Sequence, residues 1–342
     1  MTDSPGQGPR LPSLKLYEDM NNALSQDNIG IPWTSERETT PKDRWYREAG
    51  VKFYPLSFGD MAENFSALVE RNLLADMAPI PKLFNSKSIL LTFGSCFADN
   101  IRKYMAALRR STGTIHVSEG LNNTFAILSY VRWALTGDDP SMGQWFIKTP
   151  EGKIRHYFED SLQDQVAIYS EMMSAHGFIF TFGMTEIWRD SETGGVFWRG
   201  IPQVVFQAGR HKFENSSFEE NRDNLLELYH LIRQHRPDVP IIFTVSPVTL
   251  SATFRNDAAV ISDCISKSTL RTAVDSVMRR NLPGLYYWPS FEIVRWFGAH
   301  IETSTFTQFS AGPDGKMRTD SSHVKDWVIE AVVKKFVEHT FT

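Results

Sequence analysis

The sequence has few cysteines, no long apolar run and no excess of positive charge. Its 342 residues include 2 cysteines, Cys96 and Cys264, too few for the disulfide framework of a small secreted domain. No stretch approaches the roughly 18 apolar residues of a membrane-spanning helix, so we expect no membrane span. A formal net charge of -4 gives no basic surface for phosphate neutralisation, so we expect no nucleic-acid partner.

The opening of the chain and its histidines argue against two further classes. Met1 to Gly6 show neither the basic start nor the apolar run of a secretory signal, which together with the scarce cysteines predicts a cytoplasmic location. The 9 histidines include no H-x-x-x-H pair and no cysteine–histidine cluster, so we expect no metal site. The sequence gives no indication of the oligomeric state.

Two regions of the chain differ in composition. Residues 1–85 begin with closely spaced proline and glycine, continue with aromatic residues in polar surroundings, and contain one apolar pattern of helical spacing, over 62–74. We interpret this region as an accessory segment, an N-terminal arm or cap. Residues 86–342 are expected to form the main domain.

Short apolar runs alternate with amphipathic stretches from residue 88 onward. The runs predict about five strands, at 88–93, 114–118, 178–182, 241–245 and 285–288, and the intervening patterns predict helices at 98–109, 124–135, 218–233, 268–278 and 324–342. Wholly apolar strands that alternate with helices are typical of a parallel sheet with helices on both faces. The predicted fold class is therefore α/β.

The ends of the predicted strands are the first places to look for a site, because ligands of open parallel sheets bind beyond the carboxyl ends of the strands. The stretches that follow the strands are 94–96, 119–123, 183–186, 246–247 and 289–290. They contain a candidate nucleophile and several groups that can hold an oxyanion, a combination that points to acyl chemistry.

A strand, a glycine and then a small hydroxyl or thiol residue form a candidate nucleophile turn at Gly94-Ser95-Cys96. Glycine allows a sharp bend, and the helix that follows offers free N–H groups and the positive end of its dipole. This setting lowers the pKa of a thiol and stabilises an oxyanion. The competing interpretation is an ordinary turn in which Ser95 caps the helix and Cys96 is a small buried residue.

A candidate base lies near the end of the chain, at His323. Asp320 precedes it by three residues, so both can share one face at the start of a helix, where a carboxylate fixes the tautomer of the imidazole. The competing interpretation is a helix-capping aspartate beside a surface histidine. Together with the Gly94 turn, the two residues predict a catalytic base and its orienting acid.

Two further stretches offer groups that could hold the oxyanion. Gly183 supplies a backbone N–H and Thr185 a hydroxyl directly after a predicted strand. Asn122 or Asn123 supplies a side-chain amide, although an asparagine at that place can equally cap a helix. Glu186 either orients an acceptor or takes part in a structural ion pair.

Three other features have structural interpretations. Lys267 and Arg271 stand four apart on a predicted helix, where they either contact a phosphate or, as we expect, face water. Trp188 and Trp198 flank a pair of glycines and predict a hairpin flap over the cleft. Their rings either stack on a sugar ring or pack in the core. Cys264 falls in an apolar helical pattern and is expected in the core.

Residues 94–98, Gly-Ser-Cys-Phe-Ala, are letter for letter the motif that names the GSCFA family, a relative of the SGNH or GDSL hydrolases. The resemblance covers roughly residues 50 to 340 and continues through ordered blocks at 121–124, 183–188, 246–247, 266–271, 289–292 and 320–323. It implies a flavodoxin-like, SGNH-hydrolase-like three-layer αβα sandwich and ester chemistry, often on carbohydrate.

The sequence departs from the wider SGNH pattern at two places. In the Gly-Asp-Ser block of those hydrolases the serine stands two residues after the glycine, a position that Cys96 holds here, while Ser95 stands in place of the aspartate. The nucleophile is therefore either Cys96, which we favour, or Ser95. The Gly-x-Asn-Asp block is replaced by residues 183–186, so Thr185 or one of the two asparagines must stand in for the oxyanion donor.

These features predict an acyl-transfer enzyme, an O-acyltransferase or an ester hydrolase, that works through a covalent acyl-enzyme. The expected substrate is a carbohydrate or a small ester, in polysaccharide or glycoconjugate metabolism. No cofactor is required, and an acyl-coenzyme A could serve as the acyl donor because thiols exchange with thioesters. The alternative is a non-catalytic carbohydrate-binding or scaffolding protein on a degenerate SGNH fold.

Overall fold

The chain divides into two compact units, Met1–Met77 and Ala78–Thr342. The computed structural model describes residues 65–94, 96–107, 112–114, 121–137, 146–148, 150, 154–156, 162–197, 200–300, 304–307, 309–311 and 315–342. The described part of the smaller unit contains helix α3 (Phe65–Asn72) and the 3-10 turn η1 (Leu74–Asp76). The helix is thus found within the bounds predicted for it.

The boundary between the two units falls between residues 77 and 78. The sequence analysis placed it between residues 85 and 86. The reason for the difference is a contact between the two ends of the larger unit. Phe84 forms a parallel bridge with Phe341, and its N–H donates to Thr340 O over 3.0 Å. Residues 78–85 are therefore part of the larger unit.

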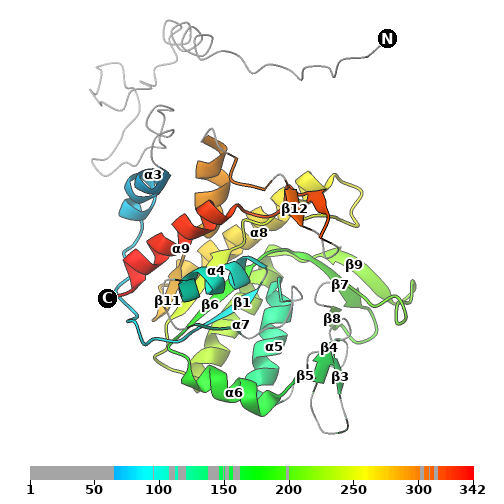
Figure 1. Ribbon diagram of the computed structural model, residues 1–342. Helices are drawn as coiled ribbons and strands as arrows, with labels where there is room; N and C mark the ends of the chain where they lie inside the picture. Colours follow the sequence, from blue (N-terminus) through cyan, green and yellow to red (C-terminus); the bar gives the residue numbers. More distant parts are fainter. Residues whose placement is uncertain are drawn as a thin grey trace, which may run out of the picture. The chain divides into compact units, whose positions relative to one another are not determined.

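A sheet of five parallel strands in the order β11-β10-β6-β1-β2 forms the centre of the larger unit (Figure 1). The strands are β1 (Leu90–Gly94), β2 (Thr112–Thr114), β6 (Gly177–Phe182), β10 (Ile241–Val245) and β11 (Leu285–Tyr287). Every residue of β6 and β10 is buried, as expected for strands covered on both faces. The predicted sheet is confirmed, although β2 begins earlier than expected and residues 115–118 lie outside the described part.

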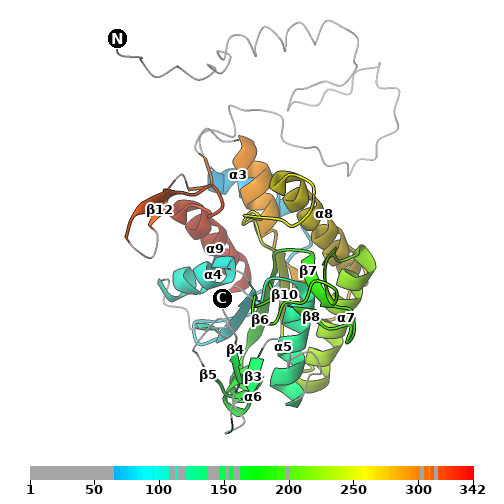
Figure 2. The same cartoon turned by 90° about the vertical axis from the view of Figure 1, so that its right-hand side faces the viewer.

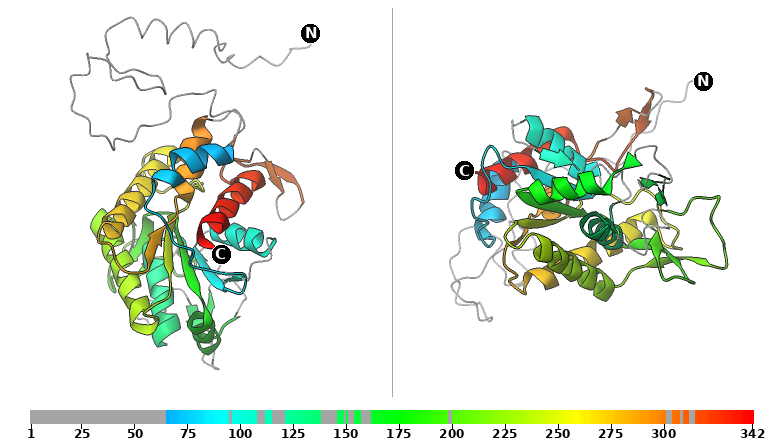
Figure 3. Two further views of the ribbon diagram at one scale, coloured as in Figure 1. Left: turned by 90° about the vertical axis from the view of Figure 1, so that its left-hand side faces the viewer. Right: turned by 90° about the horizontal axis from the view of Figure 1, so that it is seen from below.

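Helices cover both faces of this sheet (Figure 2, Figure 3). On one face, α4 (Cys96–Ala107) packs against α9 (Asp326–Thr340); on the other, α7 (Phe218–His235) packs between α5 (Thr124–Thr136) and α8 (Ala259–Met278). Helix α6 (Gln165–Ser174), which was not predicted, packs against α5. The expected three-layer αβα sandwich is confirmed. None of the helices in the described ranges is long and apolar enough to cross a membrane.

Three small antiparallel sheets and two short helical turns complete the described structure. They are β3 (Phe146–Lys148), β4 (Ile154–His156) and β5 (Leu162–Gln163); β7 (Glu186–Asp190), β8 (Val196–Phe197) and β9 (His211–Asn215); β12 (Phe309–Ala311) and β13 (Met317–Thr319); and the turns η3 (Glu292–Trp296) and η4 (Phe297–His300). Strands β7 and β8 form the predicted hairpin, with Trp188 opposite Phe197 and Gly194 at φ +73°. Trp198 lies outside the described residues.

The buried face of helix α8 carries polar side chains, although the sequence analysis expected Cys264 of this helix in the core. Its buried face includes Ser262, Asp263, Ser266 and Lys267. Cys264 points away from that face and is exposed, so the expectation that it lies in the core is wrong. Arg271, expected to face water, forms an ion pair with Glu292.

Candidate active site

Strand β1 passes into helix α4 within one residue. Gly94 ends the strand with φ +124°, and a Cβ there would lie 2.2 Å from Thr181 O of the neighbouring strand, so only glycine fits. The helix begins at Cys96. The expected order of strand, glycine and helix is found. Ser95 and the side chain of Cys96 lie outside the described residues, and their assignment as nucleophile stays a prediction.

Asp320 and His323 are in contact just before α9. His323 Nδ1 lies 2.6 Å from Asp320 Oδ2, and Asp320 Oδ1 accepts hydrogen bonds from the backbone N–H groups of Ser322 (2.9 Å) and His323 (3.2 Å). The carboxyl side chain is 7% exposed and the imidazole side chain 48%. The structure therefore brings the two expected residues together, with Nδ1 held by the carboxylate and Nε2 left to act on a ligand.

The surroundings of Asp320 keep its carboxyl ionised. Burial alone would raise the pKa of Asp320, but the hydrogen bonds from Ser322 and His323 hold this pKa well below its usual range. Ser322 contributes its hydroxyl as well as its N–H, with Oγ 2.8 Å from Asp320 Oδ1. A lasting negative charge beside Nδ1 stabilises the imidazolium that forms when Nε2 takes a proton.

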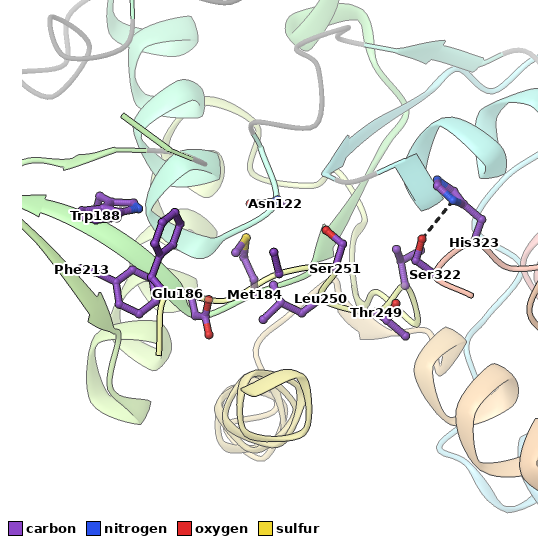
Figure 4. A pocket seen from close by; sticks show the side chains of 13 residues that line it. Asn122, Met184, Glu186, Trp188, Phe213, Thr249, Leu250, Ser251, Ser322 and His323 are labelled. Atoms are coloured by element: carbon purple, nitrogen blue, oxygen red, sulfur yellow. Dashed lines mark hydrogen bonds between the residues drawn. The ribbon is translucent and has the colours of Figure 1, made fainter. Parts of the chain in front are cut away.

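A pocket of about 440 Å³ lies beside His323. Figure 4 shows His323 at one end of it, Trp188 and Phe213 at the other, and Asn122 between them. The lining comes from the segments that follow β6 and β10, from the residue before the cap of α5, from β7 and β9, and from the loop before α9. The pocket thus lies beyond the carboxyl ends of parallel strands, where a ligand site is expected.

The two asparagines before α5 differ in their contacts. Asn123 is the N-cap of the helix, since its buried Oδ1 accepts from Ala126 N over 2.8 Å. Asn122 lines the pocket, and its Oδ1 is buried without a hydrogen-bond partner in the described structure. The capping interpretation therefore holds for Asn123. Asn122 Nδ2 donates to no described residue, so the N–H groups of this amide are left for a ligand.

The N–H of Gly183 is engaged within the protein. It donates to Asn122 O over 2.7 Å, and Met184 N donates to the same oxygen over 3.1 Å. These two bonds hold the backbone of Asn122 beside the pocket. They correct the expectation that Gly183 binds an oxyanion, because its N–H already has a partner.

Thr185 is enclosed by the protein and does not reach the pocket. It is 0% exposed, and its Oγ1 lies 2.6 Å from Asn215 Oδ1 and 2.9 Å from Ser266 Oγ. The expectation that this hydroxyl replaces the missing oxyanion asparagine is corrected accordingly. Ser266 stands 81 positions further along the chain, so the sequence around Thr185 gave no sign of this contact.

Lys267 supports the segment after β6. The residue is 4% exposed, and its Nζ donates to Gly183 O over 2.5 Å. That carbonyl belongs to the same peptide group as the Met184 N–H that donates to Asn122. The expectation that Lys267 faces water is wrong, because its ammonium group is fixed inside the protein behind the pocket wall.

Asp263 supports the loop after β10 in a similar way. Its Oδ1 accepts from Leu250 N over 2.8 Å and its Oδ2 from Arg295 over 2.6 Å, and Arg295 Nε donates to Pro247 O over 2.7 Å. The loop that begins at Pro247 forms a large part of the pocket wall, which the sequence analysis missed beyond its first residue. A signal existed: Asp263 and Lys267 stand four apart, so both lie on one helix face.

Glu186 is the first residue of β7 and lies at the pocket end away from His323. It is 4% exposed, and its Oε1 accepts from Thr253 Oγ1 over 2.6 Å. Burial raises the pKa of this carboxyl, against the opposing effects of Thr253 and Arg255. Within the described residues Glu186 forms no salt bridge, and its role in orienting an acceptor stays a prediction.

Three aromatic rings stand next to Glu186, two of them missed as candidates in the sequence. The ring centroids of Trp188 and Phe213 are 5.5 Å apart, those of Trp188 and Phe254 are 5.0 Å apart, and those of Phe213 and Phe254 are 5.5 Å apart. Rings at such separations pack directly on one another. They form one aromatic wall, from which Phe254 projects with 71% exposed.

The arrangement suits proton transfer at one end of the pocket and polar recognition at the other. His323 Nε2 is available to take a proton, and the Asn122 amide stands between the two ends (Figure 4). In the part of the chain that the structure describes, no group of three or more His, Cys, Asp or Glu could hold a metal ion.

Solved structures that resemble this one include esterases and an acyltransferase. A protein described as a GDSL-like lipase, from Bacteroides ovatus, is 15% identical with a TM-score of 0.34, and the match covers 75% of this chain and 52% of that one. The salicylyl-acyltransferase SsfX3 of a tetracycline biosynthetic pathway is 11% identical (TM-score 0.36, coverage 75% and 54%). A family two carbohydrate esterase from Clostridium thermocellum is 11% identical (TM-score 0.34, coverage 77% and 65%). The chain spans about half the length of the first two.

Sequence comparison matches this chain to a protein family, although no curated protein matches it. The sequence model of the GSCFA family matches residues 89–308, which is more than half of the 342 residues. The match includes the Gly94 turn and the loops after β6 and β10, and it ends before Asp320. The chain therefore belongs to the GSCFA family.

Proposed function

We propose that this protein is an acyl-transfer enzyme, an ester hydrolase or an O-acyltransferase, that works through a covalent acyl-enzyme. The observation that carries the proposal is the Asp320–His323 pair at the edge of the pocket, with Nδ1 and the carboxylate 2.6 Å apart. The turn at Gly94 supports it, because it ends a strand at the same edge of the sheet.

The reaction divides into two halves that share one base. His323 Nε2 removes the proton of the nucleophile, which attacks the carbonyl carbon of the ester. The bond to the leaving oxygen then breaks, and the imidazolium returns the proton to that oxygen. In the second half His323 takes a proton from water or an acceptor hydroxyl, whose oxygen attacks the acyl-enzyme, and the proton returns to the nucleophile. Asp320 stabilises the imidazolium in both halves.

Cys96 is the proposed nucleophile, with the serine before it as the alternative. Helix α4 begins at Cys96, so the N–H groups and dipole of its first turn favour a thiolate there. Gly94 is paired in register with Thr181 of β6, and Gly183, two residues after Thr181, contacts Asn122 beside the pocket. The turn and the pocket thus share one edge of the sheet.

The proposed oxyanion hole combines a side chain with backbone groups. Asn122 supplies its amide from the pocket wall, where Gly183 and Met184 hold its backbone. The free N–H groups at the start of α4 supply the remaining donors.

The substrate side of the proposal is a carbohydrate or a small ester, with water or a hydroxyl as acceptor. An acyl-coenzyme A is a second candidate donor, because a thiolate exchanges readily with a thioester. We propose polysaccharide or glycoconjugate metabolism as the setting of this activity, as the resemblance to the GSCFA family suggests.

Pre-steady-state turnover of p-nitrophenyl acetate tests this function. We expect a burst of p-nitrophenol stoichiometric with enzyme, which Ser95→Ala retains and which Cys96→Ala and His323→Ala lose. A burst that is lost with Ser95→Ala and kept with Cys96→Ala would move the nucleophile to the serine. No burst and no turnover by the wild type, with this ester or with acetyl-coenzyme A, would contradict the function and favour a non-catalytic carbohydrate-binding protein.

A further inference from the structure

The pocket end away from His323 has a composition of its own. Glu186 supplies its polar group and is held by a hydrogen bond from Thr253, which is not itself part of the lining. Trp188, Phe213 and Phe254 supply its aromatic wall. We call these five residues the Glu186 subsite. Figure 4 shows the Glu186 carboxylate beside the rings of Trp188 and Phe213.

The carboxylate of Glu186 has unused hydrogen-bonding capacity. The residue is 4% exposed and lines the pocket, and Thr253 donates to Oε1 over 2.6 Å. No described residue donates to Oε2. Oε2 therefore keeps its lone pairs for the hydroxyl or N–H donors that a ligand brings into the pocket.

The charges around the pocket argue against an anionic ligand. Among the described residues that line it, none is a lysine or an arginine, and Glu186 would repel a phosphate or carboxylate. Arg255 acts on Glu186 from nearby, but its guanidinium is already bound to Asp257, with Nη2 2.7 Å from Oδ2.

The spacing of the rings argues against a cationic ligand. An ammonium group held by aromatic residues needs ring faces that surround it. In the Glu186 subsite the three centroids lie 5.0 to 5.5 Å from one another, so the rings fill the space between them.

We propose that the Glu186 subsite binds an uncharged sugar ring, a pyranose, with its C–H face on the aromatic wall and its hydroxyls donating to Glu186. A pyranose unites an apolar face with several hydroxyl donors, which are the two features that the subsite complements. The assignment rests on the proposed function for one point: a sugar bound there presents an ester or an acceptor hydroxyl towards His323 at the other end.

Binding measured without turnover tests the subsite separately from the acyl chemistry. The probes are the methyl glycosides of glucose, galactose and N-acetylglucosamine, with choline and coenzyme A as charged counterparts. Each is titrated into the full-length His323→Ala variant, and tryptophan fluorescence and saturation-transfer NMR report binding. We expect at least one glycoside to bind, and to bind about tenfold more weakly when Glu186→Gln or Phe254→Ala is added.

Matched control variants separate recognition from general damage. Glu219→Gln changes an exposed glutamate in the first turn of α7, and Phe309→Ala removes a ring that is 57% exposed outside the pocket. Both control variants are expected to leave glycoside binding unchanged. The test variant Phe254→Ala should keep its fold, because the ring that it removes is largely exposed.

Three outcomes would overturn the proposal. They are the absence of glycoside binding, glycoside binding that neither Glu186→Gln nor Phe254→Ala weakens, and binding of choline or coenzyme A that depends on Glu186 more strongly than glycoside binding does. Failure of the proposed function would look different: the wild type would form no acyl-enzyme, while glycosides would still bind in a way that depends on Glu186.

Discussion

The two ends of the pocket are built in different ways. At the His323 end, the base and its acid stand three residues apart, and hydrogen bonds within residues 320–323 set their geometry. At the Glu186 end, the groups come from β7, β9 and the loop after β10, and the hydrogen-bonded Glu186 and Thr253 are 67 positions apart. The reactive pair is a local feature of the chain, whereas the recognition end depends on the assembly of the whole domain.

Removing the base should separate the two ends most clearly. We expect His323→Ala to lower kcat/KM for p-nitrophenyl acetate by about 10²–10⁴-fold, the usual contribution of a general base. Glycoside binding at the Glu186 subsite should be unchanged within error, because His323 is half exposed and its loss leaves no buried gap. Equal losses of turnover and of glycoside binding would show that catalysis and glycoside binding both depend on His323, which would contradict the division of the pocket into two ends.

Changing Asp320 to asparagine tests the His323 end through its charge. We expect the free energy of unfolding to fall by about 2–3 kcal/mol near neutral pH, because hydrogen bonds to a buried charge are lost. The pKa of Asp320 is lowered in the folded protein, so its contribution is present above the usual carboxylate range and is lost as the pH falls below that range.

Urea unfolding from neutral to acidic pH measures this effect. The difference between wild type and Asp320→Asn should shrink towards acid, as Asp320 takes up a proton. Asp238→Asn, which changes an exposed aspartate, serves as the control and should show no such trend. A difference that stays constant across the pH range would contradict the charge-based account.

Lys267→Met tests the support that lies behind the middle of the pocket. Loss of its bond to Gly183 O should cost roughly 2 kcal/mol of unfolding free energy and lower kcat, because Asn122 loses its fixed position. In the Asn122→Ala background the same change should cause no further fall in kcat, whereas the stability loss should remain. Lys212→Met, at an exposed lysine of β9, is the control. Additive effects on kcat would show that Lys267 does not act through Asn122.

Glu186→Gln should have the smallest effect on stability, on the order of 1 kcal/mol, and its sign depends on pH. Burial raises the pKa of Glu186, so the folded wild type loses stability as the pH rises through this raised pKa. The glutamine variant has no such loss, so its free energy of unfolding should rise relative to that of the wild type towards neutral pH. Thermal unfolding over weakly acidic to neutral pH measures the trend, and a relative loss of stability by the variant as pH rises would contradict it.

The parts of the molecule that short segments determine could be predicted from the sequence. Strands β1, β6, β10 and β11 are apolar runs ended by glycine, serine or proline, so their place in a buried parallel sheet followed from pattern alone. The contact of Asp320 with His323 followed from their spacing. The turn at Gly94 followed from a glycine between a strand and a helix.

The parts that depend on distant partners could not be predicted in the same way. Thr185 looked like an oxyanion donor until its contact with Ser266, 81 positions away, was seen. Lys267 looked like a surface lysine because nothing near it in the sequence shows that Gly183 O accepts its proton. The aromatic wall includes Phe213 from β9. This antiparallel strand does not belong to the alternating strands and helices that the sequence predicted.

The covalent acyl-enzyme is the central claim, and mass spectrometry tests it most directly. Intact-protein mass after a brief incubation with p-nitrophenyl acetate, followed by digestion under acidic conditions, identifies any acylated residue. We predict one acetyl group per chain on the peptide that contains Ser95 and Cys96, released by hydroxylamine at neutral pH as a thioester, and absent from the His323→Ala variant. An acetyl group elsewhere in the chain, or an adduct that forms equally well without His323, would contradict the mechanism.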